Sequence, residues 1–87
     1  MLKYGNTIEK ILVLSTAHMP NSDPNFGRYR VLKGEHEHIV VIGALGTMQA
    51  EEWFEPIVEW AQRDGCTYVC FDRDADIAEG WLKAYDW

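Results

Sequence analysis

Short apolar runs dominate this sequence and limit the elements that it can form. Residues 11–14, Ile-Leu-Val-Leu, are continuously apolar but too few for a helix, and Ser-Thr-Ala-His follows them. Such a run predicts a buried strand. Residues 19–27 then hold two prolines, two asparagines and a glycine, which predicts a long loop.

A second and a third strand are predicted from residues 28–32 and 38–42. The first of these segments alternates polar with apolar residues, the second is apolar, and residues 33–35 supply a turn between them. This is the pattern of a β-hairpin. Residues 66–71 are rich in strand-forming residues and predict a fourth strand.

Residues 47–64 have apolar side chains at helical spacing. Thr47 is a suitable N-cap, and Gly65 follows the segment as a C-terminal cap. Pro56 lies inside the pattern, where its missing N–H removes a backbone hydrogen bond. We therefore expect a helix that is kinked near residues 52–56.

These elements predict one α+β domain that spans residues 1–87. The order is β-β-β-α-β, with one kinked amphipathic helix on one face of a small, mainly antiparallel sheet. Apolar residues make up 47% of the chain, which is enough for a core. No apolar run reaches the roughly 18 residues that cross a bilayer, and residues 1–10 do not resemble a secretion leader. We expect a cytoplasmic protein that does not bind membranes.

The two cysteines, Cys66 and Cys70, lie in the predicted fourth strand. Four residues of extended chain separate their Cα atoms by about 13 Å. This is too far for a disulfide between them. We expect two small core residues with free thiols.

Charge is distributed unevenly along the chain. Residues 48–87 hold ten acidic residues against three basic ones, a net charge of −7, whereas residues 1–47 sum to +1. An acidic surface is repelled by phosphate backbones and by anionic membranes. We therefore expect no direct binding to nucleic acid.

Several short motifs resemble those of a known group of proteins. They are Ser-Thr-Ala-His at 15–18, Gly-Cys at 65–66, Phe-Asp-Arg-Asp at 71–74 and Tyr-Asp-Trp at 85–87. Together they resemble a small family of uncharacterised proteins from phages, plasmids and bacterial mobile elements. In that family the first motif leads into an acidic helix, whereas here the loop at 19–27 follows it. The resemblance implies an accessory role in the contest between mobile elements and host defences, and it brings no enzymatic activity with it.

Three aspartates, Asp72, Asp74 and Asp76, follow the predicted last strand at alternate positions. Calcium loops of the EF-hand type begin in this way, but Ile77 stands where such a loop needs glycine and Lys83 where it needs glutamate. A strand followed by Asp-x-Asp is also similar to the nucleophile motif of haloacid-dehalogenase-type phosphatases. Those enzymes need further strands and catalytic residues, which the few residues after Asp72 cannot supply. We predict a solvated acidic turn. A metal-dependent hydrolase that uses Asp72 and Asp74 is the alternative.

The histidines give a second candidate metal site. His36 and His38 alternate on the predicted third strand, which places both imidazoles on one face, as metal-binding pairs require. His18 could complete a three-nitrogen site or assist the aspartates. Spacing marks no fourth ligand, so we expect no metal and no cofactor. Residues 15–16, Ser-Thr, lack the glycines that expose a catalytic serine, and they predict a hydrogen-bonded strand end.

Glutamates recur along the predicted helix. Glu51, Glu55 and Glu59 follow one another at intervals of four, with Glu52 beside them. On a helix they form a stripe with carboxylates about 6 Å apart, which is similar to the spacing of phosphates along one nucleic-acid strand. Such a stripe can occupy a groove that binds nucleic acid.

Four tryptophans are many for a core of this size. We expect Trp53 and Trp60 to face the sheet, Trp81 to be buried against it, and Trp87 to stay partly exposed as a binding anchor. The aromatic residues near the C-terminus also support a structural or regulatory homodimer as a third interpretation.

The preferred hypothesis is a non-enzymatic phage or mobile-element inhibitor. It binds a host protein or ribonucleoprotein defence complex, of the anti-CRISPR or anti-restriction type, in part by mimicry of nucleic acid. The residues predicted to bind this partner are acidic or aromatic and lie in the second half of the chain: Glu51, Glu52, Glu55, Glu59, Asp72, Asp74, Asp76 and Trp87.

Overall fold

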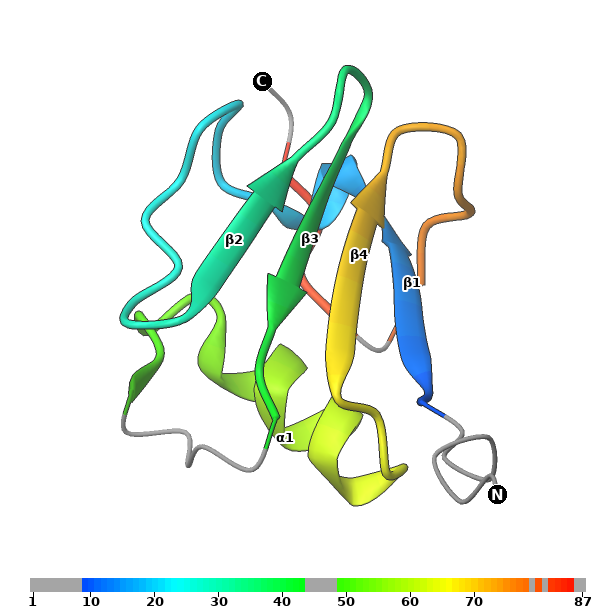
Figure 1. The fold of residues 1–87 in the computed structure, drawn as a ribbon. Helices are drawn as coiled ribbons and strands as arrows, with labels where there is room; N and C mark the ends of the chain where they lie inside the picture. Colours follow the sequence, from blue (N-terminus) through cyan, green and yellow to red (C-terminus); the bar gives the residue numbers. More distant parts are fainter. Residues whose placement is uncertain (1–8, 44–48, 79, 81, 86–87) are drawn as a thin grey trace, which may run out of the picture.

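The computed structural model describes residues 9–43, 49–78, 80 and 82–85. Its elements follow the chain in the predicted order with one short addition (Figure 1): β1 (Ile11–Ser15), the 3₁₀ helix η2 (Thr16–His18), β2 (Arg30–Lys33), β3 (Glu37–Val41), α1 (Glu55–Arg63) and β4 (Tyr68–Asp72). The α+β class and the β-β-β-α-β order are confirmed. Each strand begins and ends within two residues of the predicted limits.

The four strands form one sheet in the order β1-β4-β3-β2. β2 and β3 form the predicted antiparallel hairpin, and β4 lies antiparallel to β3 on its other side. β4 also pairs with β1, and this pairing is parallel. The sheet is therefore mixed, with antiparallel pairing in the majority. Parallel neighbours need a crossover connection, which here consists of the hairpin, α1 and the segments between them.

Side chains on one face of the sheet pack against α1. In β4, Val69 and Phe71 are fully buried, and they alternate with side chains that face the other way. α1 contributes Ile57, Val58 and Ala61, which recur at helical spacing. The rest of the core comes from all parts of the chain: Leu14, Met19, Phe26, Tyr29, Val40, Ile42, Phe54 and Cys66.

The helix begins later than the sequence predicts. Its first residue is Glu55 and its N-cap is Phe54, so Pro56 lies in the first turn. A proline there loses no hydrogen bond, because the first N–H groups of a helix have no partner within it. The predicted helix is therefore too long at its start: residues 51–54 form a turn that leads into α1, and Pro56 lies where the helix starts. Thr47, the predicted N-cap, lies outside the described residues.

The end of the helix agrees with the prediction. α1 ends at Arg63, and Gly65 follows with a positive φ of 77°. Within the described part of the chain, the structure contains no helix that is long and apolar enough to cross a membrane. β4 starts after Cys66, and both Cys66 and Cys70 are free thiols.

The long loop between η2 and β2 supplies core residues. Met19, Pro24 and Phe26 are buried. The ring of Phe26 lies 5.3 Å from that of Phe54 and 5.8 Å from that of Phe71, measured between centroids. The predicted loop is therefore folded against the core.

The buried imidazole of His18 fixes the segment that follows β4. Its Nε2 accepts a hydrogen bond from the Ala78 N–H at 2.9 Å. Its Nδ1 therefore carries the proton and donates to the Lys83 carbonyl, also at 2.9 Å. The Tyr85 N–H donates to the Ala17 carbonyl at 2.7 Å. Together these bonds hold the C-terminal segment against η2, on the same side of the sheet as the core.

Candidate partner-binding surface

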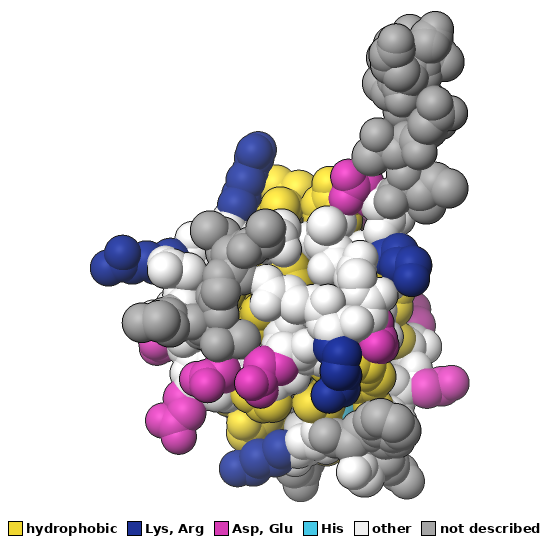
Figure 2. All heavy atoms as spheres, turned by 90° about the horizontal axis from the view of Figure 1, so that it is seen from below, with side chains coloured by type: hydrophobic (Ala, Val, Ile, Leu, Met, Phe, Trp, Pro, Cys, Tyr) yellow, Lys and Arg dark blue, Asp and Glu magenta, His cyan; other side chains and the backbone are white. Residues whose placement is uncertain are grey.

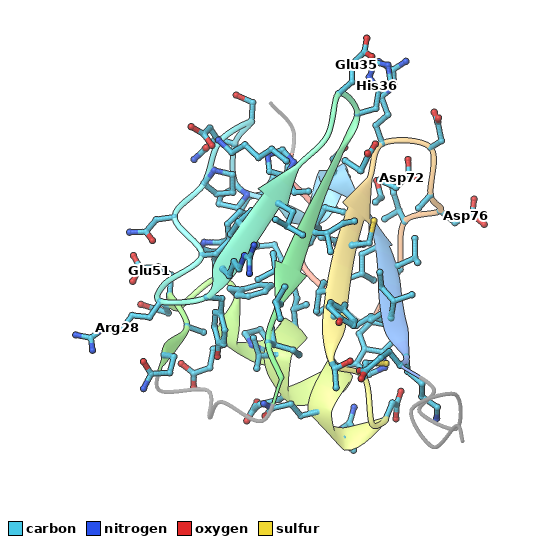
Figure 3. All side chains as sticks on the ribbon, viewed as in Figure 1. Arg28, Glu35, His36, Glu51, Asp72 and Asp76 are labelled. Atoms are coloured by element: carbon cyan, nitrogen blue, oxygen red, sulfur yellow. The ribbon has the colours of Figure 1, made fainter. Side chains whose placement is uncertain are left out.

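The acidic residues predicted to bind a partner lie in two separate groups. Figure 3 shows Glu51 at one side of the molecule and Asp72 and Asp76 at the opposite side, with Glu35 and His36 at the tip of the β2–β3 hairpin. The groups are apart because β4 runs from the end of the sheet next to α1 to the opposite end. The predicted residues therefore form two surfaces rather than one.

The first group lies around the start of α1. Glu55 and Glu59 are exposed on the helix one turn apart, whereas Glu51 and Glu52 are exposed in the turn before it. The Glu55 N–H donates to the Glu51 carbonyl at 3.1 Å, so this turn continues the path of the helix. Three glutamates were expected to form a stripe on one helix. Only Glu55 and Glu59 lie on the helix, and Glu51 lies in the turn before it. Figure 2 views this end of the molecule and shows several acidic side chains close together on one side, with further acidic side chains on the opposite side and Lys and Arg side chains among them.

The loop after η2 holds this turn in place. The Arg28 N–H donates to the Gln49 carbonyl at 2.9 Å, and the Glu51 N–H donates to the Phe26 carbonyl at 3.3 Å. Gly27 between them has a φ of 103°, and a Cβ there would lie 2.1 Å from the Gln49 carbonyl oxygen. Only glycine allows the two segments to approach this closely.

A cleft of about 540 Å³ opens between this turn and the C-terminal segment. The Trp53 indole in its wall is fixed, because its N–H donates to the Asn25 carbonyl at 2.7 Å. The cleft combines carboxylates with aromatic rings, and its lining residues come from two segments that are far apart in the sequence: Glu51, Glu52, Trp53, Pro56, Lys83 and Tyr85.

The position of Lys83 shows that an aromatic ring of this cleft can hold a cation. Its Nζ lies over the ring of Tyr85, 4.9 Å from the ring centroid. A cation over an aromatic face is stabilised by roughly 0.5–1 kcal/mol at an exposed site. Glu51 and Glu52 add negative charge to the same cleft. The two carboxylates outnumber the Lys83 ammonium, so the charged side chains of the cleft sum to −1, which suits a further cationic group, such as the Lys or Arg side chain of a partner.

The second group forms a turn at the far end of the sheet. The Asp72 carboxylate accepts a hydrogen bond from the Asp74 N–H at 2.9 Å, and the Asp72 carbonyl accepts one from the Ala75 N–H at 3.1 Å. Asp74 and Asp76 are exposed, and the nearest ion pair joins Asp74 to Arg73 at 3.9 Å. The carboxylate of Asp72 thus stabilises the turn, as expected for a residue of this type after a strand.

The structure gives the hydrolase alternative no metal site in its described part. Both nitrogens of His18 are hydrogen-bonded to backbone groups, so neither is available to assist Asp72 and Asp74. Across residues 9–43, 49–78, 80 and 82–85, no group of three or more His, Cys, Asp or Glu side chains is arranged to hold a metal ion. The Ser15 hydroxyl accepts a hydrogen bond from the Ala17 N–H, which confirms the hydrogen-bonded strand end.

The other two histidines have different surroundings. His36 is exposed in the turn before β3, 3.7 Å from the Glu35 carboxylate. His38 is half-buried, its ring is 6.1 Å from that of Phe26, and its buried Nδ1 has no partner among the described residues. Burial lowers the pKa of His38, and the Lys33 ammonium lowers it further. These surroundings therefore favour the neutral form of His38.

The tryptophans in the described residues lie partly against the core. Trp53 belongs to the turn before α1, and its ring is 6.0 Å from that of Phe71. Trp60 is half-buried on α1, and its N–H donates to the Asp64 carboxylate at 2.9 Å. The predicted burial of Trp81 and the predicted binding role of Trp87 both lie outside the described residues.

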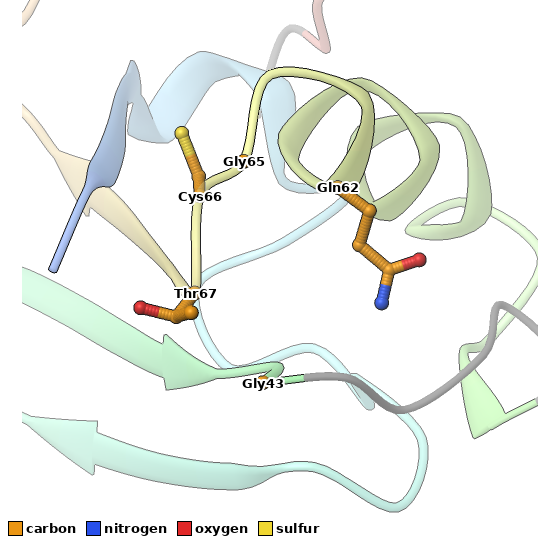
Figure 4. A pocket seen from close by; sticks show the side chains of 5 residues that line it. All are labelled: Gly43, Gln62, Gly65, Cys66 and Thr67. Atoms are coloured by element: carbon orange, nitrogen blue, oxygen red, sulfur yellow. The ribbon is translucent and has the colours of Figure 1, made fainter.

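A smaller pocket of about 260 Å³ lies beside the end of α1 (Figure 4). Its lining is Gly43, Gln62, Gly65, Cys66 and Thr67. Much of this wall is backbone, and the N–H groups of Ile42 and Gly43 are already donated to the Thr67 carbonyl at 3.0 and 3.1 Å. The larger cleft is therefore the better candidate for binding.

Comparison with known proteins identifies a family and no activity. Residues 11–87 match the sequence model of DUF5983, a family of unknown function, in its C-terminal domain. No curated protein and no solved structure matches the chain. The resemblance to uncharacterised proteins thus holds at the level of the family, and the phage or mobile-element origin stays a prediction.

Proposed function

This chain belongs to the DUF5983 family and matches the C-terminal domain of that family. We propose that it is a protein that binds a basic macromolecular partner and has no catalytic activity. The observation that carries this proposal is the cleft in which Glu51 and Glu52 lie beside Trp53 and Tyr85. Aromatic rings concentrate binding energy at interfaces, and carboxylates select a cationic group.

The charge distribution supports the same kind of partner. Residues 48–87 carry a net charge of −7, and Glu55 and Glu59 extend the acidic surface from the cleft along α1. Proteins that handle nucleic acid have basic grooves, which an acidic surface complements.

We propose further that the partner is a host defence complex and that the protein inhibits it in the cytoplasm. This finer proposal rests on the resemblance of its motifs to proteins of phages, plasmids and mobile elements. The anti-CRISPR and anti-restriction classes are the two forms that such inhibition takes, and in both the target carries a groove for DNA or RNA.

A titration with a basic peptide tests the cleft. Deca-arginine is added to the protein, and binding is followed by tryptophan fluorescence, since Trp53 lies in the cleft wall. We expect binding that weakens as salt rises through the range of Debye screening, and no binding of deca-glutamate or of duplex DNA. Glu51→Gln/Glu52→Gln should weaken binding about tenfold, which corresponds to about 1.4 kcal/mol for two carboxylates.

A matched variant separates the site from the overall charge. Asp74→Asn/Asp76→Asn removes the same two charges from exposed positions at the other end of the molecule. It should change the affinity for the peptide less than about twofold, because salt at physiological concentration screens charges that lie this far from the cleft. If both double variants weaken peptide binding equally, then only the net charge of the protein matters, and the proposal that the peptide binds in the cleft is wrong.

A further inference from the structure

The second face of the sheet is apolar, and no described element covers it. Strand pairing aligns Val13, Cys70, Ile39 and Leu32 in one row across all four strands. A second row aligns Ile11, Tyr68 and Val41, again on this face because side chains alternate along a strand. In Figure 1 the C-terminal segment passes behind the sheet, and this open face is turned toward the viewer.

This face departs from the usual pattern for a sheet with one covered side. Such sheets alternate apolar residues inside with polar residues outside. Here Val13 is 50% exposed, Leu32 46% and Ile11 45%. Single exposed apolar residues need no explanation, but a continuous row that crosses a sheet is typical of an interaction surface.

The two ends of the open face carry opposite charges. Arg30 lies at one end, in register with Val41. Asp72 and Glu37 are paired at the other end. Both carboxylates are close enough to Cys70 to raise the pKa of its thiol, after the larger effect of burial. The Glu37 side chain lies over Gly34, where a Cβ would be 1.9 Å from its Oε1.

We propose that this face packs against the same face of a second copy of the chain, with the strands of the two copies antiparallel. In that arrangement the row from Val13 to Leu32 meets its own copy. The end that carries Arg30 in one copy meets the end that carries Glu37 and Asp72 in the other. A two-fold interface requires this self-complementarity, and face-to-face sheets pack at about 10 Å.

The overall charge of −6 does not oppose this contact strongly. The glutamates around α1 lie on the covered side of the sheet, away from the contact. Within the paired strands, the charged residues on the open face are Arg30, Glu37 and Asp72, which sum to −1. The dimer therefore keeps two acidic clefts on its outside, one on each copy, whatever those clefts bind.

The size of the face sets the strength of the contact. Four strands of about five residues, at a spacing of about 4.8 Å and a rise of about 3.3 Å, give a flat area of about 300 Å² per copy. Stable interfaces bury about 800 Å² per partner. The dimer is therefore weak and reversible, and it dissociates on dilution.

Analytical ultracentrifugation tests the dimer on the unmodified protein. We expect the weight-average mass to be near the monomer value of 10.0 kDa at about 10 µM and to approach twice that value at about 1 mM. Leu32→Lys places a charge in the row on an edge strand, where the side chain is already 46% exposed, and should keep the mass at the monomer value. Ile77→Lys is the matched control, because Ile77 is 45% exposed outside the strands, and it should dimerise as the unmodified protein does.

The two native thiols give a second measurement that needs no variant. Cys70 lies in the row, whereas Cys66 is 9% exposed, precedes β4 and belongs to the core. With iodoacetamide in excess, Cys70 should be alkylated several times more slowly at about 1 mM than at about 10 µM, while the rate at Cys66 stays the same. A protein that stays monomeric at 1 mM, with equal Cys70 reactivity at both concentrations, would overturn the proposal.

Discussion

The two faces of the sheet carry the same kinds of side chain with different consequences. In β1, Leu14 is 2% exposed on the face that packs with the core, whereas its neighbour Val13 is 50% exposed on the open face. In β4, Phe71 is likewise buried on the core face, whereas its neighbour Cys70 is only partly buried on the open face. Apolar area stabilises the fold by roughly 25 cal/mol per Å² only where water is removed. The covering elements, and not the residue types, decide which apolar side chains stabilise the fold and which remain available for binding.

The largest expected difference between the faces follows from shortening one aromatic side chain of the core. Phe54 is fully buried and its ring contacts those of Phe26, Tyr29, Trp53 and Phe71. Phe54→Ala should lower the free energy of unfolding by about 3–5 kcal/mol, measured by urea denaturation.

On the open face, Val13→Thr should change the free energy of unfolding by no more than about 0.5 kcal/mol when measured at about 10 µM protein. If Phe54→Ala does not fold, Phe54→Leu supplies the comparison, with a loss of about 1 kcal/mol. Equal losses at Phe54 and Val13 would mean that the open face is covered in solution even in the dilute protein.

An intermediate effect is expected on the covered side at His18. Removing its imidazole leaves the Ala78 N–H and the Lys83 carbonyl without their partner. His18→Leu should lower the free energy of unfolding by about 2–4 kcal/mol, because both backbone groups lose a hydrogen bond. The Tyr85 amide, which donates to the Ala17 carbonyl, should also exchange its hydrogen faster.

The exposed His36 is the control for His18, and His36→Leu should change the stability by less than about 0.5 kcal/mol. Unchanged exchange at Tyr85 in His18→Leu would show that the C-terminal segment is held by other contacts.

The smallest effect is the pH dependence contributed by His38. Its pKa is lowered in the folded protein from the usual 6.5, so the unfolded chain binds a proton that the folded chain does not. Stability is therefore complete above about pH 6.5 and falls as the pH drops below it. His38→Phe should make the free energy of unfolding less dependent on pH between about 7 and 5, because the variant has no imidazole that the unfolded chain can protonate. An identical pH slope in the variant and the unmodified protein would assign the dependence to other groups.

Local sequence patterns predicted the four strands and the order of strands and helix correctly. The hairpin from β2 to β3 follows from alternation and from turn residues that are adjacent in the chain. The start of α1 was missed because Thr47 and Pro56 are both residues that begin helices, and the sequence alone favours a long helix over a turn followed by a short one. The parallel pairing of β1 with β4 depends on contacts between distant residues, which no local pattern encodes.

The candidate site was predicted only in part. Glu51 and Glu52 were expected to bind a partner and do line the cleft, but Trp53, Lys83 and Tyr85 were not assigned to it. Their proximity results from the His18 hydrogen bonds, which return the C-terminal segment to η2. The closing aromatic motif was the one signal in the sequence that pointed to this segment. The separation of the aspartates from the glutamates likewise follows from the length of β4.

The position of β4 between β1 and β3 also determines the order of events during synthesis. The hairpin can form as soon as residue 41 is available, because its two strands are neighbours in the chain. β1 has no other neighbour in the sheet than β4, which begins at residue 68. A ribosome adds about 5–20 residues per second, so β1 stays unpaired for roughly 3–10 s after it is made. During that interval its apolar residues are exposed on both sides, and a chaperone or a second nascent chain has its best opportunity to bind them.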